Sequence, residues 1–268
     1  MIGERAALVE ARDLRKAFAV SGAAWEKSER RAQAVDGVSL RIERGEIFGI
    51  VGESGCGKTT LARMVLRLIE PDSGKIRFAG QDWLAARGAE MRAIRRRMQM
   101  VFQDPVASLD PRMCVEAIVG EPVEIHESEL RRSEIRERVL AALESVGLSA
   151  DALRRYPHEF SGGQRQRIGI ARALILRPEF IIADEPVSAL DVSIGAQILE
   201  LLERLQRELS LTLLLISHNL PVVAQMATHV AVMQAGRFVE SGPARRVLSA
   251  PEHAYTQSLL AAVPKLPV

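Results

Sequence analysis

The sequence has few cysteines, few aromatic residues and almost no net charge, and these shortages exclude several classes of protein. Cys56 and Cys114 are the only cysteines among 268 residues, so we expect free thiols in a reducing compartment rather than a disulfide-stabilised secreted scaffold. Aromatic residues make up 4% of the chain, and 36 lysines and arginines face 34 aspartates and glutamates. A protein that binds nucleic acid mainly through its phosphates is usually more basic, and basic in one patch.

Long hydrophobic runs are also missing. The longest runs, such as Leu211–Ile216, fall far short of the roughly 20 residues that span a bilayer. The first residues include acidic side chains and no long apolar stretch, which argues against a secretory signal. With 47% apolar and 26% charged residues, the composition is globular. We therefore expect a soluble intracellular protein, long enough for a full hydrophobic core in one or two domains.

Strand-like and helix-like patterns alternate along most of the chain, which predicts an α/β fold with a mainly parallel sheet. Between about 104 and 160 the pattern is charged and helical, including Glu129–Val146, and we interpret it as a helical insertion. Residues 243–268 are predicted to form a short helical appendix. The expected strands are 7–18, 35–51 (with an apolar strand at Glu46–Val51), Met98–Phe102, Phe180–Ala183 and Leu211–Ile216, and the expected helices are Lys58–Glu70, Gln164–Leu176 and a stripe of Ile194, Ile198, Leu201, Leu205 and Leu209.

Residues 52–59 (GESGCGKT) fit the pattern G-x-x-x-x-G-K-[ST] of a phosphate-binding loop. They lie between a predicted strand and a predicted helix. This context favours a phosphate-binding loop over a glycine-rich turn that matches the pattern by chance. Glycines let successive N–H groups point at phosphate oxygens, and the helix adds the positive end of its dipole. Lys58 supplies a flexible point charge for the β- and γ-phosphates, and Thr59 a hydroxyl for Mg²⁺. The predicted phosphate-site residues are Gly52, Glu53, Ser54, Gly55, Cys56, Gly57, Lys58, Thr59 and Thr60.

Chemically active residues also follow two of the apolar strands. Asp184 and Glu185 come directly after Phe180–Ala183, and His218 comes two residues after Leu211–Ile216. Ligands bind at the carboxyl ends of parallel strands, so we expect these side chains at one site. Asp184 would hold Mg²⁺ through water, Glu185 would face the attacking water and His218 would contact the γ-phosphate. An ordinary acidic turn and a structural histidine are the competing interpretations.

A further glycine pair, in Ser161-Gly-Gly-Gln-Arg165, precedes a helical pattern and indicates a second anion-binding helix start. With this motif the chain resembles the ATP-binding subunits of ABC transporters over nearly its whole length. The resemblance implies a P-loop NTPase fold with a RecA-like core, an antiparallel β subdomain and an inserted helical subdomain, all in a single domain. The motifs, in family order, are the phosphate loop, Gln103, the signature 161–165, Asp184-Glu185, the D-loop Ser188–Asp191 and His218. The parts of the domain that the resemblance implies are the core (about 7–103 and 162–242), the helical subdomain (104–161) and the tail (243–268).

The resemblance also implies the mechanism. Two subunits would face head to tail and enclose two ATP molecules, each between one subunit's phosphate loop and the other's signature. Gln103 would contact Mg²⁺ and the water, and Phe18 would stack on adenine, with Trp25 as a competitor and core packing as the other interpretation. Relatives often have Asp where this chain has Asn219. The remaining residues implied at the nucleotide are Ser161, Gly162, Gly163, Gln164 and Asp191.

Three stretches are similar to the peptide and nickel importer group, in particular to its F-type ATPase subunit. They are residues 101–113, 185–193 and 251–264, although the last alone fits any amphipathic C-terminal helix. The implied partners are a second ATPase subunit (a homologous D-type chain or a second copy), two membrane permeases and an external binding protein, with no nucleic acid. The subunit would lie in the cytoplasm on the inner face of the membrane. No cysteine follows Cys114, so we expect no iron–sulfur cluster.

Other functions fit the sequence less well. A soluble ABC-type ATPase that acts on nucleic acid or ribosomes usually needs two cassettes in one chain, a long coiled-coil insertion or a basic arm. An ordinary P-loop kinase or GTPase has no use for the 161–165 motif. The cargo stays open among dipeptides, longer peptides, nickel and peptide-like metabolites.

Overall fold

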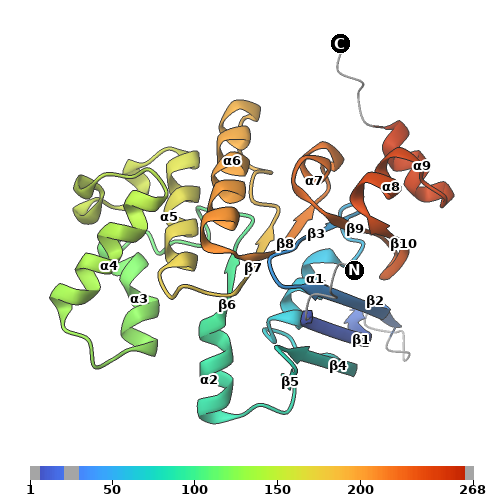
Figure 1. Cartoon of the computed structure of the whole chain (residues 1–268), viewed down its shortest axis with the longest axis horizontal. Coiled ribbons are helices and arrows are strands. Elements are labelled where there is room, and N and C mark those ends of the chain that lie inside the picture. Colours follow the sequence, from blue (N-terminus) through green and yellow to red (C-terminus); the bar gives the residue numbers. More distant parts are fainter. Residues whose placement is uncertain (1–6, 21–29, 263–268) are drawn as a thin grey trace, which may run out of the picture. The chain divides into compact units, whose positions relative to one another are not determined.

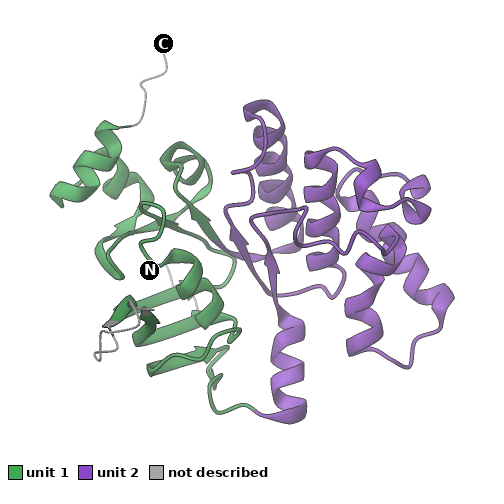
Figure 2. Cartoon of the chain, turned by 180° about the vertical axis from the view of Figure 1, so that it is seen from behind, with its two compact units in different colours: residues 1–86, 215–268 green, residues 87–214 purple. Residues whose placement is uncertain are grey.

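The computed structural model describes residues 7–20 and 30–262 (Figure 1). The chain divides into two compact units. Unit 1 comprises residues 1–86 and 215–268, and unit 2 comprises residues 87–214 (Figure 2). The domain arrangement expected from the sequence, with boundaries near 103, 161 and 242, stays a prediction beside this division.

Unit 1 contains an antiparallel sheet with the strand order β2-β1-β4-β5. A second set of strands places β9 parallel to β3 and antiparallel to β10. Across these three strands Val51, Val232 and Glu240 are register partners. The elements of unit 1 are β1 (Ala7–Val20), β2 (Arg30–Glu43), β3 (Ile47–Val51), α1 (Lys58–Val65), β4 (Ser73–Phe78), β5 (Gln81–Asp82), α7 (Leu220–Met226), β9 (His229–Gln234), β10 (Arg237–Pro243), α8 (Ala244–Ser249) and α9 (Ala254–Ala261).

Unit 2 combines the parallel strands β6 and β7 with most of the helices that follow residue 86. Strand β8 (Thr212–Ser217) crosses the boundary between the units, and the six-stranded sheet has the order β10-β9-β3-β8-β7-β6. The elements of unit 2 are α2 (Gly88–Arg97), β6 (Met98–Val101), α3 (Val115–His126), α4 (Arg132–Ser145), the 3₁₀ helices η1 (Ala150–Arg154) and η2 (Pro157–Glu159), α5 (Gly162–Leu174), β7 (Phe180–Asp184) and α6 (Val192–Leu209).

Every residue of β3, β7 and β8 is buried. Near-continuous apolar runs of this kind are typical of parallel strands that are covered on both faces. Together with the pairing of β3 with β9 and of β6 with β7, they confirm the predicted α/β class with a mainly parallel sheet. None of the helices in the part of the chain that the structure describes is both long enough and apolar enough to cross a membrane.

The first helix is shorter than its apolar spacing predicts. The pattern predicts Lys58–Glu70, but α1 ends at Val65, and Leu68 on the expected apolar face is 54% exposed. Arg67 has the left-handed backbone angle φ +53°, which ends a right-handed helix. Its guanidinium donates to the carbonyl oxygens of Trp83 and Ala86, at 3.0 and 2.8 Å. These tertiary hydrogen bonds override the local helical pattern.

The predicted stripe on α6 is buried at its centre and not at its C-terminal end. Ile198, Leu201 and Leu205 are buried, as the 3.6-residue period predicts. Leu209 is 51% exposed, because it is the last residue of the helix and Ser210 then turns the chain with φ +53°.

Candidate functional site

The phosphate loop joins β3 to α1 in unit 1 and is crowded at two of its glycines. A Cβ atom at Gly52 would lie 2.1 Å from the carbonyl oxygen of Met233, and one at Gly57 would lie 2.1 Å from that of Ala34. Gly57 also has φ +112°, which side-chain-bearing residues rarely adopt. The loop therefore requires glycine at both positions to keep this shape.

We expect Gly52→Ala to lower the free energy of unfolding by about 2–4 kcal/mol and to abolish nucleotide binding, because the new methyl group must displace strand β9. Urea unfolding and equilibrium ATP binding measure the two effects. Gly169→Ala is the matched control, because a Cβ atom there meets nothing within 4 Å. Wild-type stability of the Gly52→Ala protein would contradict the crowding.

Lys58 begins α1 and is only 4% exposed. Its ammonium donates to the carbonyl oxygens of Gly52 and Glu53, at 2.7 and 2.8 Å, and lies 3.8 Å from the Cys56 sulfur. The charge is thus buried but held by the carbonyls of its own loop, which lowers the cost of burial. An anionic phosphate oxygen is a stronger acceptor than these neutral carbonyls, so the lysine is poised to exchange partners.

The remaining loop residues divide by exposure. Glu53, Ser54 and Gly55 are exposed, whereas Thr59 and Thr60 are partly buried.

Cys56 is buried as a free thiol. Burial raises its pKa, and the Lys58 charge opposes that shift only in part. The thiol therefore stays protonated at neutral pH, which agrees with the free thiol expected from the sequence.

Two contacts hold the loop from outside. Gly236 N–H, in the turn between β9 and β10, donates to the Cys56 carbonyl oxygen at 2.9 Å. Glu53 N–H donates to the Tyr255 hydroxyl oxygen on α9 at 3.2 Å. Tyr255 is not among the site residues predicted from the sequence, although it is one of only two tyrosines in the chain and lies in the tail stretch 251–264 that is similar to the importer group.

Phe18, on β1, is predicted to stack on adenine and is 41% exposed. The Lys16 ammonium lies 5.8 Å from the centre of its ring, within the range of a cation–π contact. An exposed ring is available to a flat ligand, whereas core packing would bury it. The competitor Trp25 lies outside the described residues, and adenine stacking stays a prediction.

His218 comes directly after β8 and is exposed. The next residue, Asn219, donates its N–H to the Ser217 hydroxyl oxygen at 3.0 Å and precedes the first residue of α7. The backbone is therefore hydrogen-bonded locally at Asn219, the residue at which the chain departs from the expected family pattern. The phosphate contact of His218 stays a prediction.

In unit 2, strand register brings two predicted residues together. Val101 of β6 pairs with Ala183 of β7, so Gln103 and Glu185 both lie two residues beyond this pair. The Gln103 amide nitrogen donates to the Glu185 carboxylate at 3.2 Å. Asp184, which ends β7, is only 2% exposed.

Glu185 itself has φ +46°. A left-handed non-glycine residue of this kind costs of order 1–3 kcal/mol and occurs disproportionately at functional sites. The strained backbone and the Gln103 hydrogen bond together fix the position of this carboxylate.

The signature lies at the start of α5, as predicted, and its first residues cap the helix. The Ser161 hydroxyl oxygen accepts the Gln164 N–H at 3.3 Å, and the Gln164 side-chain oxygen accepts the Ser161 N–H at 3.0 Å. A Cβ atom at Gly163 would lie 2.4 Å from the Ile194 side chain on α6. Ser161, Gly162 and Gln164 remain exposed, as does Asp191, the residue before α6. The signature thus presents a helix N-terminus and a hydroxyl at the surface of unit 2.

The predicted magnesium ligands are Thr59, Gln103 and Asp184. All three side chains offer oxygen atoms, which Mg²⁺ prefers, and such sites normally add phosphate oxygens to one or two carboxylates. Among the described residues no cluster of three or more His, Cys, Asp or Glu side chains could hold a metal by itself. This donor set fits an ion that binds together with a nucleotide.

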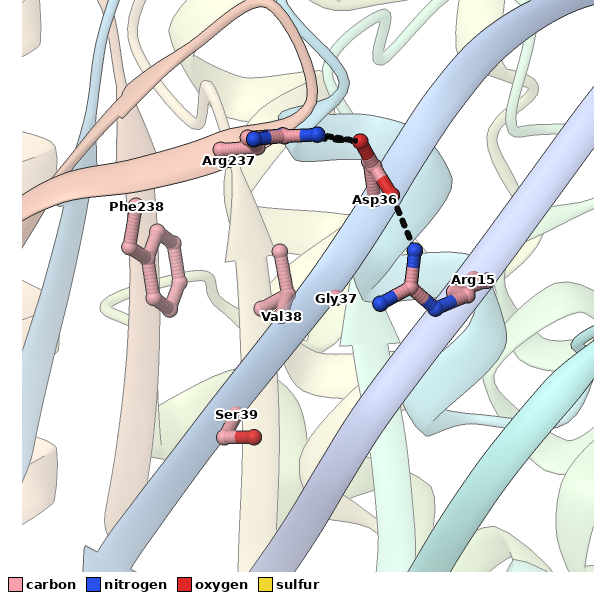
Figure 3. A pocket seen from close by; sticks show the side chains of 7 residues that line it. All are labelled: Arg15, Asp36, Gly37, Val38, Ser39, Arg237 and Phe238. Carbon is pink, nitrogen blue, oxygen red and sulfur yellow. Dashed lines mark hydrogen bonds and ion pairs between the residues drawn. The ribbon is translucent and has the colours of Figure 1, made fainter.

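A shallow cavity of about 440 Å³ lies elsewhere in unit 1, lined by Arg15, Asp36, Gly37, Val38, Ser39, Arg237 and Phe238 (Figure 3). The Asp36 carboxylate pairs with both arginines, accepting the Arg237 Nε–H at 2.7 Å and the Arg15 guanidinium. This ion network links β1, β2 and β10. None of the predicted nucleotide residues lines the cavity, so we assign it a structural role.

Comparison with known proteins gives concordant results. Residues 35–188 match the family described as ABC transporter. The oligopeptide transport ATP-binding protein OppF of Salmonella typhimurium is 48% identical over 266 residues, which are 98% of this chain and 80% of that protein. The oligopeptide transport ATP-binding protein AppF of Bacillus subtilis is 49% identical over 258 residues, or 96% and 78% of the two chains.

The fold of this chain is similar to that of solved ATP-binding cassettes. A dimer of the ATP-binding cassette MJ0796 bound to ADP and Pi gives a TM-score of 0.77 at 28% identity, covering 88% of this chain and 99% of that one. CbiO1 from Clostridium perfringens, part of the ABC transporter complex cbiONQ, gives a TM-score of 0.76 at 28% identity, covering 91% of both chains.

Proposed function

The chain belongs to the ABC transporter family, and we propose that it is the ATP-hydrolysing, energy-coupling subunit of an importer for dipeptides or oligopeptides. The observation that carries this proposal is the near-full-length similarity to ATP-binding subunits named for oligopeptide transport. The phosphate loop, the carboxylates after β7 and the capped signature supply the groups that ATP hydrolysis needs.

The roles of the residues follow from their chemistry. Lys58 leaves the carbonyls of Gly52 and Glu53 to bind the β- and γ-phosphates as a point charge. Glu185 accepts the proton of the attacking water, and the Gln103 amide keeps its carboxylate oriented. His218 contacts the γ-phosphate. When bound, Mg²⁺ neutralises charge on the phosphate oxygens, and Asp184, Thr59 and Gln103 are the residues that would hold it.

The signature acts on the ATP of a second subunit. Its helix N-terminus and the Ser161 hydroxyl form a donor set for a γ-phosphate, and both are exposed. Similarity to a dimeric cassette bound to ADP and Pi supports the pairing of two subunits, and we propose that they face head to tail. We propose that Gly162, Gly163, Gln164 and Asp191 take part in the same contact with the second subunit's nucleotide.

The proposed partners are a second ATPase subunit, either a homologous D-type chain or another copy, two transmembrane permeases and an external solute-binding protein. The subunit is proposed to sit in the cytoplasm on the inner face of the membrane. The peptide-transport names of the relatives favour peptides over nickel or peptide-like metabolites as cargo. They also favour the importer over an ABC-type ATPase that acts on nucleic acid or ribosomes.

Mass spectrometry of proteins that co-purify with a tagged copy from gently solubilised native membranes tests this proposal. We expect two permeases, with or without a second ATPase. The Lys58→Ala protein, which we expect not to hydrolyse ATP, is purified in the same way to show whether assembly depends on hydrolysis. Ribosomal or DNA-repair proteins in a soluble fraction, without a permease, would contradict the importer function.

We expect Ser161→Arg to leave nucleotide binding by the isolated subunit unchanged and to lower hydrolysis by the assembled pair by about 10²-fold or more, because the donors act on the partner's nucleotide. Titration with MgATP and steady-state hydrolysis measure the two properties. Ser133→Arg, exposed on α4, is the matched control. Loss of nucleotide binding by the isolated Ser161→Arg subunit would argue against action in trans.

A further inference from the structure

The tail helix α9 reaches the phosphate loop through one side chain. The Tyr255 hydroxyl oxygen accepts the Glu53 N–H at 3.2 Å. On the other side of the same residue, the Glu53 carbonyl oxygen accepts the Lys58 ammonium at 2.8 Å. Glu53 is therefore held by the tail through its N–H and by the predicted phosphate-binding lysine through its carbonyl.

The start of α9 is itself anchored. The Glu240 carboxylate on β10 accepts the Glu252 N–H at 2.9 Å and the His253 N–H at 3.1 Å. His253 Nδ1 then accepts the Tyr255 N–H at 3.1 Å and caps the helix. Thr256, next to Tyr255, is fully buried. A tyrosine on such a fixed helix start loses little conformational freedom when it makes a further hydrogen bond.

Strand register places this anchor in line with the loop. Glu240 pairs with Val232 on β9, and Val232 pairs with Val51, the residue directly before the loop. The turn between β9 and β10 holds the second half of the loop, because Gly236 N–H donates to the Cys56 carbonyl oxygen at 2.9 Å. Tyr255 holds the first half. The two contacts fix the loop at both ends of its curve.

We propose that Tyr255 is a positioning residue for ATP binding: its hydroxyl fixes the Glu53 peptide and keeps the phosphate loop in its binding shape. The proposal rests on the proposed function of the chain as an ATPase. A loop ordered in advance loses less entropy when a ligand binds, so the contact acts on affinity. Burial raises the pKa of the Tyr255 hydroxyl, which keeps it neutral at physiological pH. It does not touch the reacting atoms, and kcat should change little.

Tyr255→Phe removes the hydroxyl and keeps the ring. In the full-length chain we expect the Kd and KM for MgATP to rise about 2- to 10-fold, the effect of one neutral hydrogen bond, while kcat stays within about 2-fold. Deuterium exchange of loop amides in the nucleotide-free protein should accelerate at Glu53. Tyr156→Phe, which changes the other tyrosine of the chain, is the matched control for both measurements.

A second variant tests the anchor without touching the loop. Glu240→Ala removes the acceptor for the α9 start and should reproduce both the affinity loss and the faster exchange. Because it acts through Tyr255, its effect on Kd should largely disappear in the Tyr255→Phe background. Independent, additive losses would overturn the proposed chain of contacts.

The outcomes separate this inference from the proposed function. Unchanged exchange and unchanged Kd in an active Tyr255→Phe ATPase overturn the positioning role and leave the ATPase intact. A tighter Kd in that variant overturns it as well. Faster exchange at Glu53 in a chain that hydrolyses no ATP, either alone or in the assembled pair, supports the tail-to-loop contact and refutes the ATPase.

Discussion

Lys58→Ala should lower ATP hydrolysis by at least about 10³-fold. The lysine is buried and its ammonium already lies inside the loop, on two carbonyl oxygens at 2.7 and 2.8 Å. Removing it deletes the only side-chain charge that we assign to the phosphates. Steady-state phosphate release by the purified, assembled pair measures the loss.

Two further variants separate charge from shape. Lys58→Arg keeps the positive charge but replaces a point charge by a planar fork in a buried site, so we expect it to be almost as inactive. Lys75→Ala, at an exposed position on β4, should hydrolyse ATP normally. Retained turnover in Lys58→Ala would remove Lys58 from the phosphate site. Thermal unfolding is needed as well, because the buried carbonyl of Gly52 and the partly buried carbonyl of Glu53 lose their donor. Leaving a buried acceptor without a donor costs about 1–3 kcal/mol.

The sequence predicts well those parts of the molecule whose structure is determined by residues that are adjacent in the sequence. The phosphate loop lies between a strand and a helix as its pattern requires, and the apolar runs at β3, β7 and β8 form buried strands. The α/β class and the resemblance to ABC transporter ATP-binding subunits are both confirmed. The roles assigned to individual site residues stay predictions.

The parts that the sequence misses depend on contacts between distant residues. The Glu53–Tyr255 hydrogen bond joins positions 202 residues apart, and no local pattern encodes it. The early end of α1 follows from Arg67 reaching the carbonyls of Trp83 and Ala86. Gln103 and Glu185 are each found by motif, but their contact also needs the parallel register of β6 and β7.

Glu185→Gln should keep ATP binding, lower hydrolysis by about 10²- to 10⁴-fold and trap an ATP-bound pair of subunits. Glutamine has the same shape and can occupy the same strained backbone, so the substitution removes a proton acceptor and little else. Its side-chain oxygen can still accept the Gln103 amide, which is now at 3.2 Å from the carboxylate. Light scattering during size-exclusion chromatography, with and without MgATP, measures the trapped pair, either with a second copy or with the partner ATPase.

The trapped pair of Glu185→Gln subunits also tests the signature. A pair that cannot hydrolyse its ATP is held together by the contacts that each signature makes with the ATP of the other subunit. Adding Ser161→Arg to Glu185→Gln should return the protein to single subunits in MgATP, whereas adding Ser133→Arg should not. Glu200→Gln, exposed on α6, should neither trap a pair nor slow hydrolysis.

Hydrolysis at the wild-type rate by the Glu185→Gln protein would remove Glu185 from catalysis, and loss of ATP binding would make it a binding residue. Because the Gln103 hydrogen bond serves to orient this carboxylate, either result would also remove the proposed function of that hydrogen bond.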